Sequence, residues 1–105
     1  MVEIPNNIIQ TINLLLTELR ENNIIIEKSV LFGPYAKGTY NKFSDIDFAL
    51  ISESFSGNRF LDKEKIRPFI VKINTDISPM PFRPEDFNSD NIFASEILKY
   101  GIAIN

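Results

Sequence analysis

Hydrophobic residues recur every three or four positions along three stretches of the chain, which is the spacing of a helix with one buried face. The first stretch covers about residues 5–21. The second covers residues 59–73, where we expect Pro68 to kink the helix or to begin a new one. The third is predicted from a cap at Asp90 to Tyr100. On this last helix the side chains expected to face inward are Ile92, Phe93, Ile97 and Leu98.

Other stretches have the composition of strands, with runs of β-branched and aromatic residues between turn residues. Two such runs lie at about residues 28–33 and 45–52, and a shorter candidate covers residues 76–78. Pro79 and Pro81 follow the short candidate. Because proline cannot donate a backbone hydrogen bond, these two residues are expected to make it an edge strand or to end it.

The segment between the first two strands carries the residues with the most distinctive chemistry. Gly33 ends the first strand before a short predicted helix, residues 34–37, and Asp45 and Asp47 open the second strand. Residues two apart on a strand point to the same face, so the two carboxylates project together and repel each other. Mg²⁺, which prefers oxygen ligands, would relieve that repulsion. Glycine lets a phosphate approach the backbone, so we expect Gly33 and the two carboxylates to form one site. Because Gly33 ends one strand and Asp45 opens the next, a shared site requires these two strands to run antiparallel.

The composition limits both the size and the chemistry of the protein. With 105 residues, 44% of them hydrophobic, we expect a single domain over residues 1–105. Cys and His do not occur, which excludes disulfides, thiolate metal sites and histidine-based catalysis, and leaves Asp and Glu as general bases. A net charge of −3 with scattered basic residues argues against nucleic acid as a partner. No signal-peptide pattern or membrane-length apolar run occurs, so we expect a soluble, cytoplasmic protein with no membrane partner.

The central segment resembles the minimal nucleotidyltransferases of the DNA polymerase beta superfamily. Their signature is Gly-Ser, ten residues and then Asp-x-Asp, and here Gly33-Pro34 stands ten residues before Asp45-Ile46-Asp47. Two later segments, Pro-Phe-Arg-Pro-Glu-Asp-Phe at residues 81–87 and Glu-Ile-Leu-Lys-Tyr-Gly-Ile at residues 96–102, resemble one branch of that family. The resemblance therefore extends over most of the chain.

This resemblance implies an α/β (α+β) fold with a polymerase-beta-like nucleotidyltransferase core, in which about four helices flank a three-stranded mixed sheet. It implies transfer of a nucleotidyl group, typically adenylyl, from ATP or another nucleoside triphosphate to a protein or other acceptor. A two-ion Mg²⁺ site would assist, since two ions roughly 3.5–4 Å apart can clamp the attacking and leaving oxygens. The shortest members of the family are often antitoxins, so the resemblance implies a HEPN-type toxin protein as the partner.

Two positions depart from the family pattern. Pro34 replaces the family's Ser and offers a phosphate neither a hydroxyl nor a backbone N–H. The third carboxylate of the family is expected where this chain has Ser78, and Asp76 lies roughly 6–7 Å away along a regular strand. The candidate catalytic and metal-binding residues are Asp45, Asp47 and Asp76, and the candidate nucleotide-binding residues are Gly33, Pro34, Lys37 and Lys42.

Two functions of different classes fit these residues. The first is an active Mg²⁺-dependent nucleotidyltransferase. The alternative is a catalytically degenerate nucleotidyltransferase fold that serves as a binding and neutralising antitoxin module, and it is motivated by Pro34 and Ser78. A third function, nucleic-acid binding or polymerisation, lacks the basic track that it would need.

Overall fold

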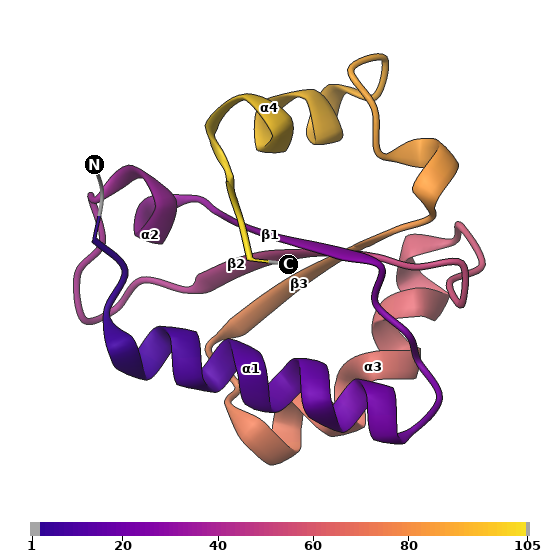
Figure 1. Cartoon of the computed structure of the whole chain (residues 1–105), viewed down its shortest axis with the longest axis horizontal. Coiled ribbons are helices and arrows are strands. Elements are labelled where there is room, and N and C mark those ends of the chain that lie inside the picture. The colour runs from indigo at the N-terminus through magenta and orange to yellow at the C-terminus, as the bar shows by residue number, and fades with distance from the viewer. Residues whose placement is uncertain (1–2, 105) are drawn as a thin grey trace.

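The computed structural model describes residues 3–104 and is built around a four-stranded sheet (Figure 1). The strands are β1 (Lys28–Phe32), β2 (Ile46–Ile51), β3 (Ile77–Phe82) and β4 (Ile102–Ala103), in the order β3-β2-β1-β4. β1 is antiparallel to both β2 and β4, whereas β2 and β3 are parallel. The sheet is therefore mixed, as predicted, and its first two strands run in the opposite directions that a shared site requires.

The sheet has one strand more than the three that the resemblance implied, because the short apolar segment β4 pairs with β1. β3 is longer than predicted and contains both Pro79 and Pro81. β3 lies at an edge of the sheet, with β2 on one side only. Alternate residues of a strand direct their backbone polar groups to opposite sides. Phe82 faces β2, because its carbonyl accepts a hydrogen bond from Ser52 N–H at 3.0 Å, so Pro79 and Pro81 face the unpaired edge, where no N–H is needed.

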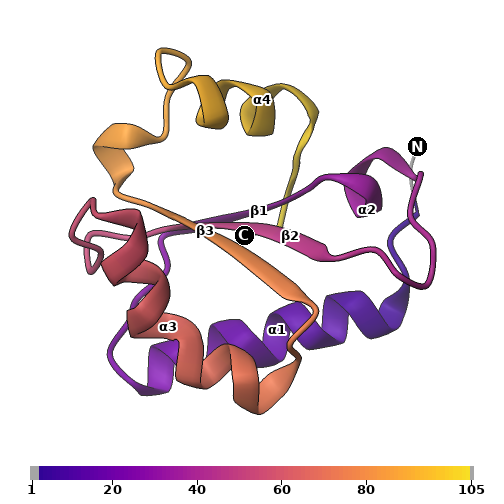
Figure 2. The ribbon, with the colours of Figure 1, turned by 180° about the vertical axis from the view of Figure 1, so that it is seen from behind.

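Helices cover both faces of the sheet (Figures 1 and 2). α1 (Asn6–Glu21) and α3 (Arg59–Ile73) pack on one face, and α4 (Ile92–Tyr100) lies over the other. The alternation of side chains along β2 divides its residues between the two cores. The core with α1 and α3 receives Ile46, Phe48 and Leu50, and the core with α4 receives Ala49 and Ile51.

Both long helices occupy the residues that the hydrophobic periodicity predicted. α3 runs without interruption through Pro68, which is exposed, so the helix neither ends nor restarts there. Asn58 caps its start, because the Asn58 side chain accepts a hydrogen bond from Leu61 N–H at 3.1 Å. The residues of α1 that are buried are Ile8, Ile12, Leu15 and Leu19.

The last helix differs from the prediction in its cap and in its buried side. Asn91, and not Asp90, caps α4, and its side-chain oxygen accepts hydrogen bonds from two backbone N–H groups at 3.0 and 3.2 Å. Ala94 and Ile97 face the core. The residues that were wrongly predicted to face inward are Ile92, Phe93 and Leu98, which are 81%, 54% and 44% exposed.

The short helix α2 (Pro34–Lys37) occurs where the sequence predicted it, and a 3₁₀ turn, η1 (Pro84–Asp86), follows β3. α2 has Pro34 at its first position and ends at Gly38, whose φ of +76° is left-handed. No helix within residues 3–104 has both the length and the hydropathy that crossing a bilayer requires.

Candidate functional site

Gly33 and Asp47 lie in contact where β1 ends and β2 begins. Phe32, the residue before Gly33, pairs with Asp47 across the antiparallel strands. The backbone of Gly33 has φ +71° and ψ −154°, a conformation that is essentially restricted to glycine. A β-carbon added at Gly33 would overlap Asp47 Oδ2 and lie 3.0 Å from Asp47 Cγ. Glycine is therefore required here both by the backbone conformation and by the space that the carboxylate occupies.

Asp45 and Asp47 form an acidic pair on the face of β2 that looks toward α4, the face that also carries Ala49. Asp45 directly precedes β2 and is exposed, whereas Asp47 is half-buried. Burial, and to a smaller extent the charge of Asp45, raises the pKa of the Asp47 carboxyl above its ordinary value. Among residues 3–104 the Asp47 carboxylate has no hydrogen-bond or ion-pair partner. Such a group would be stabilised by a bound cation.

The donor set of the acidic pair suits Mg²⁺. Both side chains offer hard oxygen ligands, and the chain contains no His or Cys that would favour a softer metal. In the described part of the chain, no three acidic side chains gather as a group that could hold a metal ion. Mg²⁺ is commonly held by only one or two carboxylates together with substrate phosphates. The arrangement therefore fits an ion whose coordination is completed by a phosphate beside Gly33.

The neighbouring strand places Ser78, and not Asp76, opposite the half-buried carboxylate. The register of β2 and β3 pairs Asp47 with Ser78, and Ile46 N–H donates a hydrogen bond to the Asp76 carbonyl at 2.8 Å. If the pairing continues by one residue, Asp76 lies beside Asp45, and Asp76 is exposed. Asp76 is therefore next to the exposed member of the acidic pair, whereas Ser78 occupies the position where the family resemblance implies a third carboxylate.

A cavity of about 360 Å³ has Gly33 in its lining, and its volume is within the range of small-molecule sites. Neither Asp45 nor Asp47 lines it, and Gly33, which lies against Asp47, connects it to the acidic pair. Two charged side chains line it, Lys37 from α2 and Glu96 from α4, and the Lys37 ammonium lies 5.4 Å from the centre of the Tyr100 ring. Sequence reasoning missed Glu96 because the residues around it indicate only a helix. The apolar and aromatic residues of the cavity are Phe32, Met80, Ile92, Phe93, Ile97 and Tyr100.

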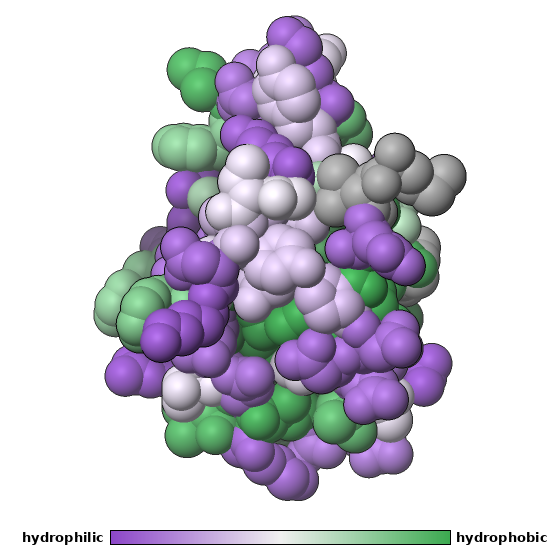
Figure 3. Space-filling view, turned by 90° about the vertical axis from the view of Figure 1, so that its left-hand side faces the viewer, coloured by the Kyte–Doolittle hydropathy of each residue, from purple (hydrophilic) through white to green (hydrophobic). Residues whose placement is uncertain are grey.

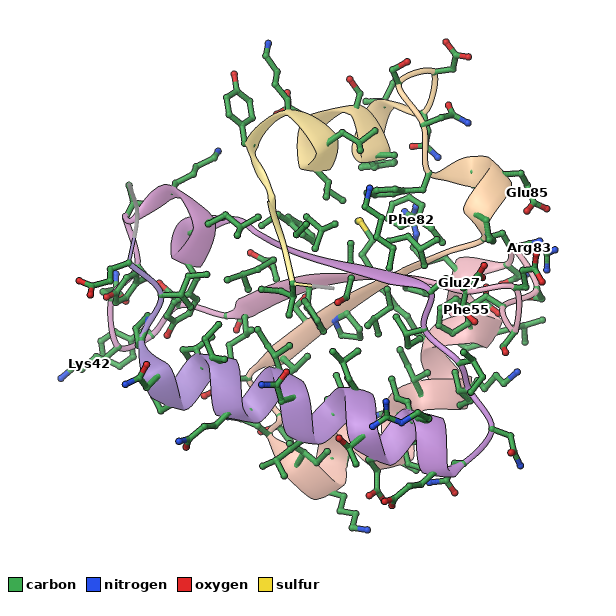
Figure 4. All side chains as sticks on the ribbon, in the orientation of Figure 1. Glu27, Lys42, Phe55, Phe82, Arg83 and Glu85 are labelled. Atoms are coloured by element: carbon green, nitrogen blue, oxygen red, sulfur yellow. The ribbon has the colours of Figure 1, made fainter. Side chains whose placement is uncertain are left out.

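The loop between α2 and β2 carries Lys42, the remaining predicted nucleotide-binding residue. Figure 4 shows Lys42 extending away from the sheet near the start of α1, and Lys42 does not line the cavity. Its ammonium lies 5.0 Å from the ring centre of Phe43, which is 82% exposed. Tyr35 and Tyr40 stack on each other, with ring centres 4.6 Å apart, which links the loop to α2. Figure 3 looks onto this end of the molecule, where polar side chains alternate with small apolar areas.

The protein family described as "Nucleotidyltransferase domain" matches residues 12–102 of the chain. A curated protein of Methanocaldococcus jannaschii, named "Putative protein adenylyltransferase MJ1305", is 32% identical over 68 residues. The matched region is 60% of this chain and 46% of that protein, so the chain spans about half the length of this relative.

Solved structures are similar over most of the chain. A "putative nucleotidyltransferase from Sulfolobus solfataricus" has a TM-score of 0.68 at 17% identity, covering 92% of this chain and 78% of that one. A toxin–antitoxin with AMP-PNP has a TM-score of 0.61 at 20% identity, covering 90% and 70%. A mutant of the toxin–antitoxin MntA-HpeT has a TM-score of 0.58 at 17% identity, covering 87% and 69%. At these identities the similarity concerns the fold.

Proposed function

We propose, since this chain belongs to the nucleotidyltransferase domain family, that it transfers a nucleotidyl group from a nucleoside triphosphate to an acceptor. The observation that carries the proposal is the contact between Gly33 and Asp47, with Asp45 on the same face of β2. We expect the group to be adenylyl and the donor to be ATP. One relative is named a protein adenylyltransferase and one structural neighbour contains AMP-PNP, which supports this choice.

Each residue at the site has a proposed role in the transfer. Asp45 and Asp47 would hold Mg²⁺, as one ion or as the two ions that the family resemblance implies, and the metal would supply positive charge that neutralises the phosphates. The backbone at Gly33 lies against the triphosphate, and the Lys37 ammonium meets its oxygens as a point charge. The acceptor's hydroxyl oxygen bonds to the α-phosphorus while the bond to pyrophosphate breaks. Asp76, exposed at the entrance, accepts the proton that the hydroxyl loses.

The nucleoside is proposed to occupy the cavity between α4 and the sheet. Gly33 and Lys37 belong both to this cavity and to the proposed phosphate site, so one ligand can reach both. The remaining walls are mostly apolar or aromatic, as in other sites that hold flat organic rings. The cavity thus provides a place for the part of the substrate that the acidic pair cannot bind.

A HEPN-type toxin is the proposed protein acceptor and partner. Two structural neighbours are described as toxin–antitoxin assemblies, and the minimal nucleotidyltransferases that this chain resembles often act as antitoxins. In this role the chain would silence its partner by attaching a nucleotide to a hydroxyl-bearing side chain of the toxin.

A second candidate function is neutralisation by binding alone. Pro34 at the start of α2 removes one N–H and one hydroxyl from the phosphate site, and Ser78 opposite Asp47 leaves the third carboxylate position without a charge. Both changes weaken catalysis without disturbing the strands or α2. A chain that had lost transfer but kept its surface could still cover a toxin.

Incubation with α-labelled ATP, Mg²⁺ and the purified candidate toxin separates these functions. Transfer predicts label on the toxin, with little label in EDTA. The variants Asp45→Asn and Asp47→Asn should each lose the label, because each removes one metal ligand while keeping the side-chain shape. Asp90→Asn, which changes an exposed carboxylate outside the site, is the matched control and should label the toxin normally.

The binding function predicts a different pattern in the same experiment. Toxin activity would then be suppressed equally by the wild type and by the Asp45→Asn, Asp47→Asn double variant, without label in either case. Label that persists in the double variant would remove the acidic pair from the mechanism.

A further inference from the structure

Glu96 is a charged residue of the cavity for which the mechanism above has no use. It comes from α4, the helix that faces the acidic pair, and it lines the same cavity as Gly33 and Lys37. In the described part of the chain, the Glu96 carboxylate forms no hydrogen bond and no ion pair. Glu96 is exposed, so its carboxylate oxygens are accessible to a molecule in the cavity.

The order of side chains along α4 places Glu96 beyond the proposed phosphate end. Tyr100 lies near the Lys37 ammonium, and Glu96 stands four residues earlier, which is about 6 Å along the helix axis. Ile92 and Phe93 lie a further turn away and also line the cavity. A triphosphate held at Gly33 and Lys37 would therefore direct its nucleoside toward Glu96 and the aromatic wall.

A carboxylate in that position selects for one chemical property of the nucleoside. An ionised Glu has only acceptor oxygens, so it favours groups that carry N–H or O–H donors and disfavours a carbonyl oxygen. The apolar side chains around it favour a flat ring over a hydrated sugar. Adenine offers an exocyclic amino group, whereas hypoxanthine, which is otherwise nearly the same shape, has an oxygen at that position.

We propose that Glu96 is a specificity-determining residue that accepts a hydrogen bond from the exocyclic amino group of the nucleobase, and so selects ATP over ITP. This inference rests on the proposed function, because it needs a nucleoside triphosphate at the acidic pair. It adds to that function the residue that determines which nucleobase is preferred.

The test is calorimetric titration of the chain with ATP, ITP and 2′,3′-dideoxy-ATP in the presence of Mg²⁺. The wild type should bind ATP at least about tenfold more tightly than ITP, the difference expected for one hydrogen bond to a charged group. Glu96→Gln should bring the ratio close to one, because a side-chain amide can accept from an amino group or donate to a carbonyl. Glu96→Ala should weaken ATP binding about tenfold and leave ITP nearly unchanged, and Asp90→Asn should preserve the wild-type ratio.

Several results would overturn the inference. An ATP-to-ITP ratio that is the same in the wild type and in Glu96→Gln would show that Glu96 does not read the base. If ITP binds like ATP, while 2′,3′-dideoxy-ATP binds more weakly than ATP to the wild type but not to Glu96→Ala, the carboxylate contacts the ribose instead. If ATP binds and depends on Asp45 and Asp47 but not on Glu96, only this inference fails. If no nucleotide binds with Mg²⁺, the proposed function fails with it.

Discussion

Replacing Gly33 with alanine tests the contact on which the site is built. Holding alanine at φ +71° and ψ −154°, a conformation almost confined to glycine, costs about 1–3 kcal/mol. The added β-carbon would also overlap Asp47 Oδ2 and lie 3.2 Å from Asp47 Cβ, so the carboxylate has to rotate away and the neighbouring backbone has to shift slightly. We therefore expect a folded protein, less stable by about 1–3 kcal/mol, in which Asp47 is turned out of the site.

Two measurements separate the backbone effect from the effect on Asp47. Thermal unfolding in EDTA reports the backbone effect, and in a domain of this size each kcal/mol lost lowers the Tm by about 4–8 °C. Calorimetric titration with ATP and Mg²⁺ reports the effect on Asp47. Misplacing a ligand of the metal should weaken nucleotide binding by about 10- to 100-fold, as with other residues that orient metal ligands.

Gly57→Ala is the matched control for this experiment. Gly57 also has a positive φ, +94°, but a β-carbon there would meet Arg83 Cδ at 3.5 Å, which is ordinary contact. Gly57→Ala should therefore lose stability through the same backbone strain and bind nucleotide like the wild type. Nucleotide binding that is equally strong in Gly33→Ala and Gly57→Ala would refute the reasoning, because the contact with Asp47 would then have no consequence for the site.

Three further predictions concern the same site. Pro34→Ser should tighten ATP binding by about tenfold through a restored hydroxyl and N–H, and should lower the free energy of unfolding by about 0.4–1 kcal/mol; calorimetry and urea denaturation measure the two effects. Ser78→Asp adds a carboxylate opposite Asp47, so its Tm should be lower than that of the wild type in EDTA and should rise more steeply with Mg²⁺. The third prediction concerns pH. Folding raises the pKa of Asp47 above 3.8, so the folded state holds the proton more tightly than the unfolded state. The resulting contribution to stability is present at low pH and is lost as the pH rises through the pKa of Asp47 in the folded protein. Asp47→Asn should therefore be more stable than the metal-free wild type at pH 7 and equally stable below about pH 3.8, as measured by urea denaturation at both pH values.

Much of the fold follows from local patterns in the sequence. The hydrophobic spacing of residues 5–21 and 59–73 gives α1 and α3 almost to the residue. The meeting of Gly33 with Asp47 was also predicted, because strand alternation sets the face of Asp47 and a shared site requires the two strands to run antiparallel, as β1 and β2 do. The match of the chain to the nucleotidyltransferase domain confirms the family that these residues indicated.

The elements that were missed depend on contacts between distant residues. β4 has only two residues, too few for a pattern, and exists because β1 offers a free edge. On α4 so many residues are apolar that periodicity finds the helix without deciding which residues are buried, and Ile92 and Phe93, which were predicted to be buried, are exposed at the cavity. Asp90 and Asn91 are both good caps, and only the structure shows which side chain reaches the first turn. Glu96 was missed for the same reason, since its place in the cavity depends on how α4 sits over the sheet.

The state of Asp47 bears on the choice between transfer and binding alone. Its pKa is raised by burial and by Asp45, so at neutral pH the ionised carboxylate lowers the stability of the metal-free fold. No partner among residues 3–104 offsets this cost. A module that only covers a toxin gains nothing from such a group, because the carboxylate lies against Gly33 and is half-buried. In a protein that binds a metal and a nucleotide, the bound cation stabilises the ionised carboxylate and offsets this loss of stability. A paired result, in which Asp47→Asn is more stable without metal and inactive in transfer, would therefore favour the enzyme over the binding module.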